Sequence, residues 1–307
     1  MKTSLEVTVI GGGVIGYTCA HELARAGHEV TVITSDPPER TTSAVAAAVW
    51  FPYSAAPADA VLRWGAESLR AFGSLAEDPG TGVSPRSGLV LHRTASPDLW
   101  WTGAVPSAET VAEGLPAGVV SATRCTLPVV DMDRYLAWLV AAAGVRTVVG
   151  EVRDLAEVPG AVVVAAGLRS GGLVGDDGLL PVRGQVVRVA NPGLTDWLID
   201  EDNPAGLTYV VPRAADVVCG GTADRGEHSV EPSPEVEAAI LARAGELAPE
   251  LRGAPVVSRA VGLRPARSTV RLDRVVRDGR VVVSCYGHGG AGVTLSWGCA
   301  ADVVALL

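Results

Sequence analysis

The N-terminal segment carries the pattern that most constrains the fold. An apolar run at 7–10 leads into a glycine-rich turn at 11–16, and apolar residues at helical spacing continue to Ala26. Gly27 is placed to end that helix, and a second apolar run follows at 30–33. This order predicts a strand, a crossover helix and a parallel strand, which is the start of an open parallel sheet.

The glycines of this turn also indicate a ligand. Gly11, Gly13 and Gly16 have the spacing G-x-G-x-x-G, in which successive glycines form a tight turn, admit a phosphate close to the backbone, and let helix pack on strand. The helix N-terminus also favours an anion. We therefore predict a dinucleotide-binding site. Asp36 lies near the expected position of an acidic ribose ligand, but next to Pro37 it is equally typical of a turn, and the sequence leaves both interpretations open.

Composition excludes several other classes. The formal net charge is −9, and no cluster of basic residues is present, which argues against a nucleic-acid partner. No run of 18 apolar residues predicts a membrane span, and neither end carries a targeting pattern, so we expect a cytoplasmic protein. The five cysteines form no C-x-x-C pair, and no metal site is predicted. Whether Cys219 and Cys285 form a disulfide is left open.

The remaining patterns alternate between two kinds of structure. Helices are expected at 58–75, 132–143, 235–247 and from Leu295, and a buried strand at 161–167. Residues 41–53 are small and weakly helical, 54–121 is mixed with short strand-like pieces such as 88–92, and 183–190, 207–213 and 216–222 alternate as antiparallel strands. We predict an α/β protein in which a Rossmann-type domain (1–53, 128–182 and 259–307) is interleaved with a substrate domain (54–127 and 183–258) built on a mostly antiparallel sheet.

Two C-terminal motifs suggest the second half of the site. Arg264 lies between a glycine-leucine pair and Pro265, where a guanidinium can hold a carboxylate through two parallel hydrogen bonds. A glycine-rich loop at 285–298 lets backbone approach a flat ligand. The chain has a single lysine, Lys2, and no recognisable proton donor of a nicotinamide dehydrogenase, so these features favour FAD.

Further motifs are spread over the whole chain. With Gly11 to Gly16 they are Thr41-Thr42-Ser43 with Trp50-x-Pro52-Tyr53, Arg183-Gly184-Gln185, Tyr209-x-x-Pro212-Arg213, Gly220-Gly221-Thr222, Gly262-Leu263-Arg264-Pro265-x-Arg267 and Tyr286-Gly287-His288-Gly289-Gly290-x-Gly292. On these motifs the chain resembles, over essentially its whole length, the D-amino-acid oxidases, FAD enzymes of the glycine/sarcosine oxidase superfamily.

The resemblance implies a role for each matching residue. Arg264 would bind the substrate carboxylate, Tyr209 would add a hydroxyl to it, the Gly290 carbonyl would accept from the amine, and Tyr53 would line the cavity. Non-covalent FAD would be held by Gly11, Gly13, Val14, Ile15, Gly16, Asp36, Thr41, Thr42, Ser43, Ala47, Ala48, Val49, Val152, Gly167, Arg264, Gly289, Gly290, Gly292, Val293 and Thr294.

The implied reaction is oxidative deamination. A hydride would pass from the substrate Cα to flavin N5, and oxygen would be reduced to hydrogen peroxide while the imine hydrolyses to an α-keto acid and ammonia. Relatives that act on acidic substrates tend to have an arginine where this chain has Ala223, and the stretch 195–207 is acidic. Neutral or apolar D-amino acids are therefore predicted, with basic ones admitted. A homodimer is also among the predictions.

Several alternatives accompany this interpretation. A glycine or sarcosine oxidase of the same superfamily, a nicotinamide dehydrogenase and a non-catalytic flavin-binding protein are the competing functions. Arg264 and Arg267 could instead form ion pairs with Asp273 or Asp224, although for Arg264 we favour function and for Arg267 a structural role. His288 is expected to orient the loop by hydrogen bonding rather than to act as a base.

Overall fold

The computed structural model describes residues 4–307, so residues 1–3, with which the predicted first domain begins, lie outside it. The elements in chain order are β1 (Glu6–Ile10), α1 (Val14–Arg25), β2 (Glu29–Thr34), α2 (Thr42–Val45), α3 (Ala58–Leu75), β3 (Val83–His92), β4 (Glu109–Val111), β5 (Ser121–Val130), α4 (Met132–Ala143), β6 (Arg146–Val149), β7 (Ala161–Val164), α5 (Ser170–Val174), β8 (Leu180–Ala190), β9 (Trp197–Asp200), β10 (Thr208–Pro212), β11 (Asp216–Gly220), β12 (Asp224–Arg225), α6 (Pro234–Leu247), β13 (Val256–Arg277), β14 (Arg280–His288) and α7 (Gly292–Leu306).

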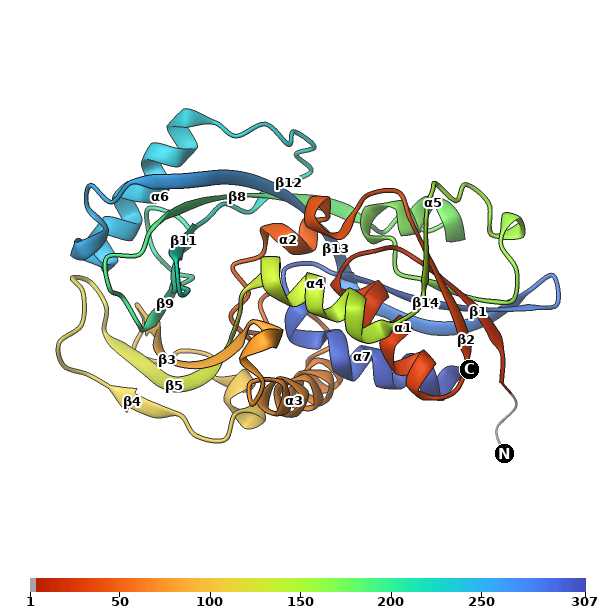
Figure 1. Cartoon of the computed structure of the whole chain (residues 1–307). Coiled ribbons are helices and arrows are strands. Elements are labelled where there is room, and N and C mark those ends of the chain that lie inside the picture. The colour runs from red at the N-terminus through yellow and green to blue at the C-terminus, as the bar shows by residue number, and fades with distance from the viewer. Residues whose placement is uncertain (1–3) are drawn as a thin grey trace.

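One hydrogen-bonded sheet runs through the molecule. Its order is β4-β5-β3-β9-β10-β11-β8-β13-β14-β7-β1-β2-β6, with β12 beside β8. Along β14-β7-β1-β2-β6 every pair is parallel, as the N-terminal pattern predicts. Along β9-β10-β11-β8-β13 the pairs are antiparallel, and Figure 1 shows β9 and β11 on the side away from the two termini. The predicted α/β class with a mostly antiparallel second region is confirmed.

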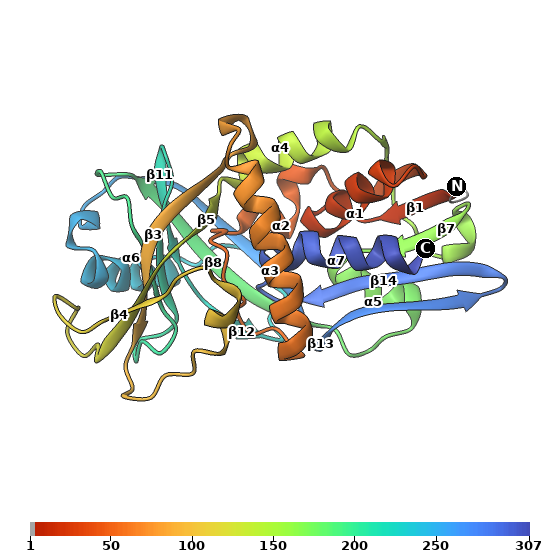
Figure 2. The ribbon, with the colours of Figure 1, turned by 90° about the horizontal axis from the view of Figure 1, so that it is seen from below.

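Helices cover the parallel strands because those strands are buried on both faces. α7 packs against α1 and α3, and α1 also packs against α4; Figure 2 shows these helices together along one side of β1, β7 and β14. The core between them includes Trp50 and Trp297, both buried, whose indole nitrogens donate to the Gly65 carbonyl (3.1 Å) and the Tyr135 hydroxyl (3.0 Å). Both tryptophans therefore pack the core.

A single helix covers the antiparallel strands. Ile240 and Ala244 of α6 pack on Val187, Val210 and Cys219 from β8, β10 and β11. Since side chains alternate along a strand, the neighbours of these residues face the opposite side of the sheet. Tyr209 is one of them, and that opposite side carries the candidate site.

The structure corrects several element predictions. Residues 83–92 and 121–130 form two long paired strands rather than short pieces, because all ten residues of β3 pair with β5. The motif around Arg264 lies inside the 22-residue strand β13, and α7 begins at Gly292, earlier than expected. In 41–53 only Thr42–Val45 is α-helical.

The division into two domains stays a prediction. Three of its four internal boundaries, after residues 127, 182 and 258, fall inside β5, β8 and β13. The long strands β8 and β13 pair over much of their length, and in Figure 1 they pass from one region of the molecule to the other. Within the described residues, no helix combines the length and apolar character needed to cross a membrane.

Candidate active site

A cavity of about 580 Å³ follows the carboxyl ends of the parallel strands and continues over the antiparallel ones. Its lining comes from the segments just after β1, β2, β6, β7 and β14, and from β8, β9, β10 and β13. Ligands of open parallel sheets bind at this edge, where the helix N-termini also lie. The cavity therefore joins the predicted dinucleotide site to the antiparallel region.

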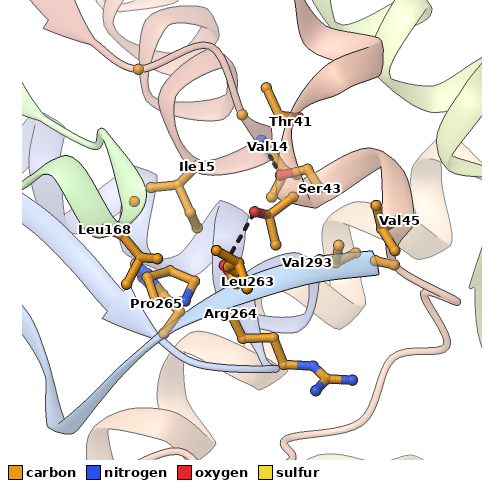
Figure 3. A pocket seen from close by; sticks show the side chains of 18 of the residues that line it. Val14, Ile15, Thr41, Ser43, Val45, Leu168, Leu263, Arg264, Pro265 and Val293 are labelled. Carbon is orange, nitrogen blue, oxygen red and sulfur yellow. Dashed lines mark hydrogen bonds between the residues drawn. The ribbon is translucent and has the colours of Figure 1, made fainter. Parts of the chain in front are cut away.

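Glycine backbone forms the wall of the cavity beside α1. A Cβ on Gly11 would lie 2.3 Å from the Ala165 carbonyl oxygen, and the φ of Gly11 is +122°. The Val14 amide at the start of α1 donates to Ser43 Oγ over 2.9 Å, and Thr42 Oγ1 donates to the Leu263 carbonyl over 3.2 Å. Figure 3 shows Val14, Thr41 and Ser43 grouped on one side of this pocket. The α1 N-terminus thus faces a groove bounded by small side chains.

Charged and hydroxyl groups gather at the far end of this groove. Asp36 follows β2, its carboxylate accepts from Ser35 Oγ (2.8 Å), and it lies 3.6 Å from the Arg169 guanidinium. Arg40 and Val152 also line the cavity. Asp36 is therefore at the cavity as well as in a turn, so the two interpretations of its sequence position are compatible.

Arg264 extends from β13 away from Val14 and Ser43 (Figure 3). Its Nη1 donates to the Thr222 carbonyl over 2.8 Å, and in residues 4–307 no carboxylate forms an ion pair with it. The alternative partners are taken, because Asp273 pairs with Arg271 (3.1 Å) and Asp224 with Arg183 (3.5 Å). Arg264 is thus a cavity-lining guanidinium without a counter-ion.

Arg267 differs from Arg264 in this respect. Its Nε lies 3.0 Å from the buried Asp176 carboxylate, which also accepts from Arg271 and from the Tyr286 hydroxyl. Those donors, with the Tyr286 hydroxyl contributing most, hold the pKa of Asp176 well below its usual range. The structural role predicted for Arg267 is confirmed, with Asp176 as its partner.

Glycines at positions 184 and 220 leave space for the side chains of Arg264 and Tyr209. A Cβ on Gly184 would lie 2.3 Å from Arg264 Nη1, and one on Gly220 would lie 2.0 Å from Tyr209 Cζ. Burial raises the pKa of Tyr209, although the charge of Arg264 acts in the opposite direction. The Tyr209 hydroxyl therefore remains a hydrogen-bond donor at neutral pH.

Gly290 completes this group. A Cβ added to it would lie 2.6 Å from Tyr53 Cδ1 and 3.6 Å from Arg264 Cδ. Arg264 is also close enough to Tyr209 for its charge to affect the pKa of the hydroxyl. The four residues predicted to contact substrate therefore lie together in one cavity. Such a set can grip a carboxylate and an adjacent polar group while an apolar wall excludes water.

Comparison with known proteins agrees with this arrangement. Residues 6–306 match the sequence profile of the DAO family, described as FAD dependent oxidoreductase. The chain belongs to the DAO family. Among curated members, it is 47% identical to a D-amino-acid oxidase of Rubrobacter xylanophilus over 310 residues (98% of this chain, 95% of the relative). It is 44% identical to a D-amino-acid oxidase of Streptomyces coelicolor, with 98% and 96% of the two chains covered, and 32% identical to human D-aspartate oxidase, with 98% and 94% covered.

Solved structures of more distant proteins share this fold. A glycine oxidase from Bacillus cereus superposes with a TM-score of 0.81 at 22% identity, covering 99% of this chain and 97% of the other. A glycine oxidase from Geobacillus kaustophilus gives 0.82 at 23% identity, with 99% and 94% covered. At these identities the likeness establishes the fold alone.

The residues of the cavity fit FAD, the cofactor of the DAO family. Gly11 and Gly13 leave the backbone open where a pyrophosphate needs close approach. Two helix N-termini, at Val14 of α1 and Gly292 of α7, border the cavity and favour negative charge. Every residue predicted to hold FAD lines this cavity except Gly16.

Gly16 is the one residue of the predicted cofactor set that does not line the cavity. A Cβ on it would lie 1.9 Å from the Gly11 carbonyl oxygen. It is glycine because helix α1 packs directly on the turn that precedes it, so its contribution to the site is to fix the position of Gly11.

His288 also differs from expectation. It lines the cavity, but its Nε2 is buried without a hydrogen-bond partner; its carbonyl, not its ring, holds the loop, by accepting from the Ala291 amide (3.0 Å). Burial lowers the pKa of His288 to about 4, so the imidazole is neutral at physiological pH.

The sequence left open whether Cys219 and Cys285 form a disulfide. In the structure both cysteines are free.

Sequence reasoning missed several residues that line the cavity. Near the predicted ribose site these are Arg40 and Arg169; Arg169 follows the buried strand β7 by a few residues, a signal that could have indicated it. At the opposite end they are Ile199, Glu201, Leu207 and Val230. The acidic character of 195–207 pointed to the first three, and nothing pointed to Val230, because the grouping of these residues depends on how strands and loops pair.

Proposed function

We propose that the chain is a D-amino-acid oxidase that uses non-covalent FAD to deaminate neutral or apolar D-amino acids. The observation that carries the proposal is the unpaired Arg264 guanidinium beside Tyr209, Tyr53 and Gly290 in the cavity that also holds the dinucleotide cradle. The curated relatives that are 47% and 44% identical are both named D-amino-acid oxidase.

The chain's own residues would act by positioning. Arg264 would bind the substrate carboxylate in a bidentate pair, with the Tyr209 hydroxyl as a further donor. The Gly290 carbonyl would accept from the amine, and Tyr53 would close the wall beside it. Holding both groups fixes the direction of the Cα–H bond, and such alignment contributes on the order of 7 kcal/mol to lowering a barrier.

No side-chain base is needed in this scheme. When bound, FAD supplies the acceptor for a hydride and returns the electron pair to oxygen as hydrogen peroxide. The neutral amine's lone pair assists departure of the hydride, and the resulting imine hydrolyses to the α-keto acid and ammonia. His288 is not required as a base, which agrees with its lack of a hydrogen-bond partner at Nε2.

A peroxide assay tests the proposal. Purified protein loaded with FAD should release hydrogen peroxide with D-alanine, D-valine and D-methionine and not with the L enantiomers. Absence of peroxide with all three D-amino acids would refute it. Sarcosine and glycine belong in the same plate, because faster turnover of sarcosine than of D-alanine would select the glycine/sarcosine oxidase alternative.

The state of the flavin is tested separately. Acid precipitation should leave a colourless pellet and a yellow supernatant, because the FAD is proposed to be non-covalent. Cys285 lines the cavity, so a yellow pellet would direct attention to a bond at its sulfur. The cytoplasmic location and the homodimer stay predictions from the sequence, and cell fractionation and light scattering test them.

A further inference from the structure

The end of the cavity beyond Arg264 contains a carboxylate to which the proposed reaction assigns no role. Glu201 lines the cavity just after β9. Ile199 pairs directly with Tyr209 across β9 and β10, and Glu201 is two residues further on. The paired residues Ile199 and Tyr209 face the same side of the sheet, and Glu201, in the turn that follows β9, lines the same cavity. The Cα atom of Glu201 is therefore within about 7 Å of that of Ile199, the residue opposite Tyr209.

Glu201 has no cationic partner within the part of the chain that the structure describes. The cations that line the cavity are Arg264, which is assigned to the α-carboxylate, and Arg40 and Arg169 near Asp36. The neighbouring Asp200 differs, because Arg93 neutralises it at 2.6 Å and Asn203 also donates to it. Glu201 thus offers the cavity a carboxylate that no cationic side chain neutralises.

The protonation of Glu201 agrees with this position. Desolvation, followed by the negative charge of the adjacent Asp202, raises the pKa of Glu201 to about 7. A bound cation would favour the ionised carboxylate and so lower this pKa. Asp202 itself is exposed and does not line the cavity.

Apolar side chains line the same cavity as Arg264 and Glu201. They include Ile199, Leu207 and Val230, the last of which is 57% exposed. The loop that carries Val230 is held on both sides: Arg183 donates to the Ser229 and Glu231 carbonyls at 3.0 and 2.6 Å. The cavity thus holds apolar side chains and a carboxylate together, and the loop that carries Val230 is fixed in place.

We propose that this surface, which we term the Glu201 subsite (Ile199, Glu201, Leu207 and Val230), binds the side chain of D-amino acids that carry a terminal cation, such as D-lysine and D-arginine. The methylene stem of such a side chain packs on the apolar residues, and the charged end reaches Glu201. This inference rests on the proposed oxidase function and deepens it, because it names a basic substrate class for which the chain has a dedicated group.

The test compares D-lysine with D-norleucine, which has the same stem without the charged nitrogen. In Glu201→Gln, the ratio of kcat/KM for D-lysine to that for D-norleucine should fall about five- to tenfold, the range for a partly exposed charged contact. Asp202→Asn is the matched control, since it removes the neighbouring charge outside the cavity, and because loss of that charge favours ionised Glu201, its ratio should not fall. Turnover of D-norleucine by each variant reports that it is folded and loaded with FAD.

The outcomes separate the inference from the function on which it rests. An unchanged ratio in Glu201→Gln, or an equal loss on both substrates, overturns the Glu201 subsite and leaves the oxidase function standing. An equal fall of the ratio in Asp202→Asn also overturns it, since the effect would then be one of general surface charge. If wild-type protein oxidises neither D-norleucine nor D-methionine, both the function and the subsite are refuted.

Discussion

A single methyl group should disable the carboxylate grip without unfolding the protein. In Gly184→Ala the new Cβ would lie 2.3 Å from Arg264 Nη1 and 2.4 Å from both Cζ and Nη2. The overlap is with the end of a flexible side chain, so the guanidinium moves and the backbone of β8 stays. The variant should therefore fold normally while its guanidinium no longer faces the substrate carboxylate.

The size of the effect follows from the bonds lost. A hydrogen bond to a charged group contributes about 1.5–3 kcal/mol, which corresponds to a fall of roughly 10- to 150-fold in kcat/KM for D-alanine. Steady-state peroxide production measures it, and flavin absorbance per mole of protein reports cofactor loading independently. Gly73→Ala is the matched control, because nothing lies within 4 Å of its Cβ, and its kcat/KM should match the wild type.

A double-mutant cycle with Arg264→Lys makes the reasoning refutable. A lysine lacks the guanidinium fork that Gly184→Ala displaces, so the alanine should cost much less in that background than in the wild type. If the two losses simply add, or if flavin-loaded Gly184→Ala keeps wild-type kcat/KM, Arg264 does not hold the carboxylate in this position.

Three further outcomes are expected. Glu201 ionises as the pH rises through about 7, so the D-lysine to D-norleucine ratio of kcat/KM should increase between pH 6 and 8 in wild type and stay flat in Glu201→Gln; a flat wild-type profile contradicts it. Asp176→Asn weakens the contacts to Arg267 and Arg271 and should lower the free energy of unfolding by about 2 kcal/mol. Since the Asp176 pKa is depressed, that stabilisation is present above pH 3.8 and lost below it, and equal denaturation midpoints at pH 7 would disprove it. Ser43→Ala removes the acceptor of the Val14 amide together with a hydroxyl predicted to bond FAD, and should weaken FAD binding about tenfold in a flavin-release titration; Ser87→Ala, an exposed position that does not line the cavity, is its control.

Much of the cofactor half of the site was predictable because its signals are local. The turn at Gly11 and Gly13 needs glycine wherever such a chain folds, since a Cβ on Gly11 would overlap the Ala165 carbonyl. The helix after it and the strand at β2 follow from periodicity. The structure keeps these elements to within one or two residues of the predicted ends.

Contacts between distant segments were harder to predict. The motif at Arg264 indicated a carboxylate ligand, but the sequence offered Asp273 and Asp224 as ion-pair partners, and only the pairing of β13 with β8 and β14 directs those carboxylates to other arginines. The same motif gave no sign of a 22-residue strand, because the glycine, proline and arginines within it do not alternate as a strand usually does.

The sequence by itself determined the α/β class, the dinucleotide turn and the identity of the groups that would grip a carboxylate, because these depend on backbone conformation and residue chemistry over a few positions. Only the tertiary structure decided which arginine stays unpaired, that His288 is buried with an unsatisfied nitrogen, and that Glu201 shares a cavity with Tyr209. Those properties depend on sheet register and on contacts between loops from distant parts of the chain. Neither the register nor these contacts can be predicted from a single short stretch of residues.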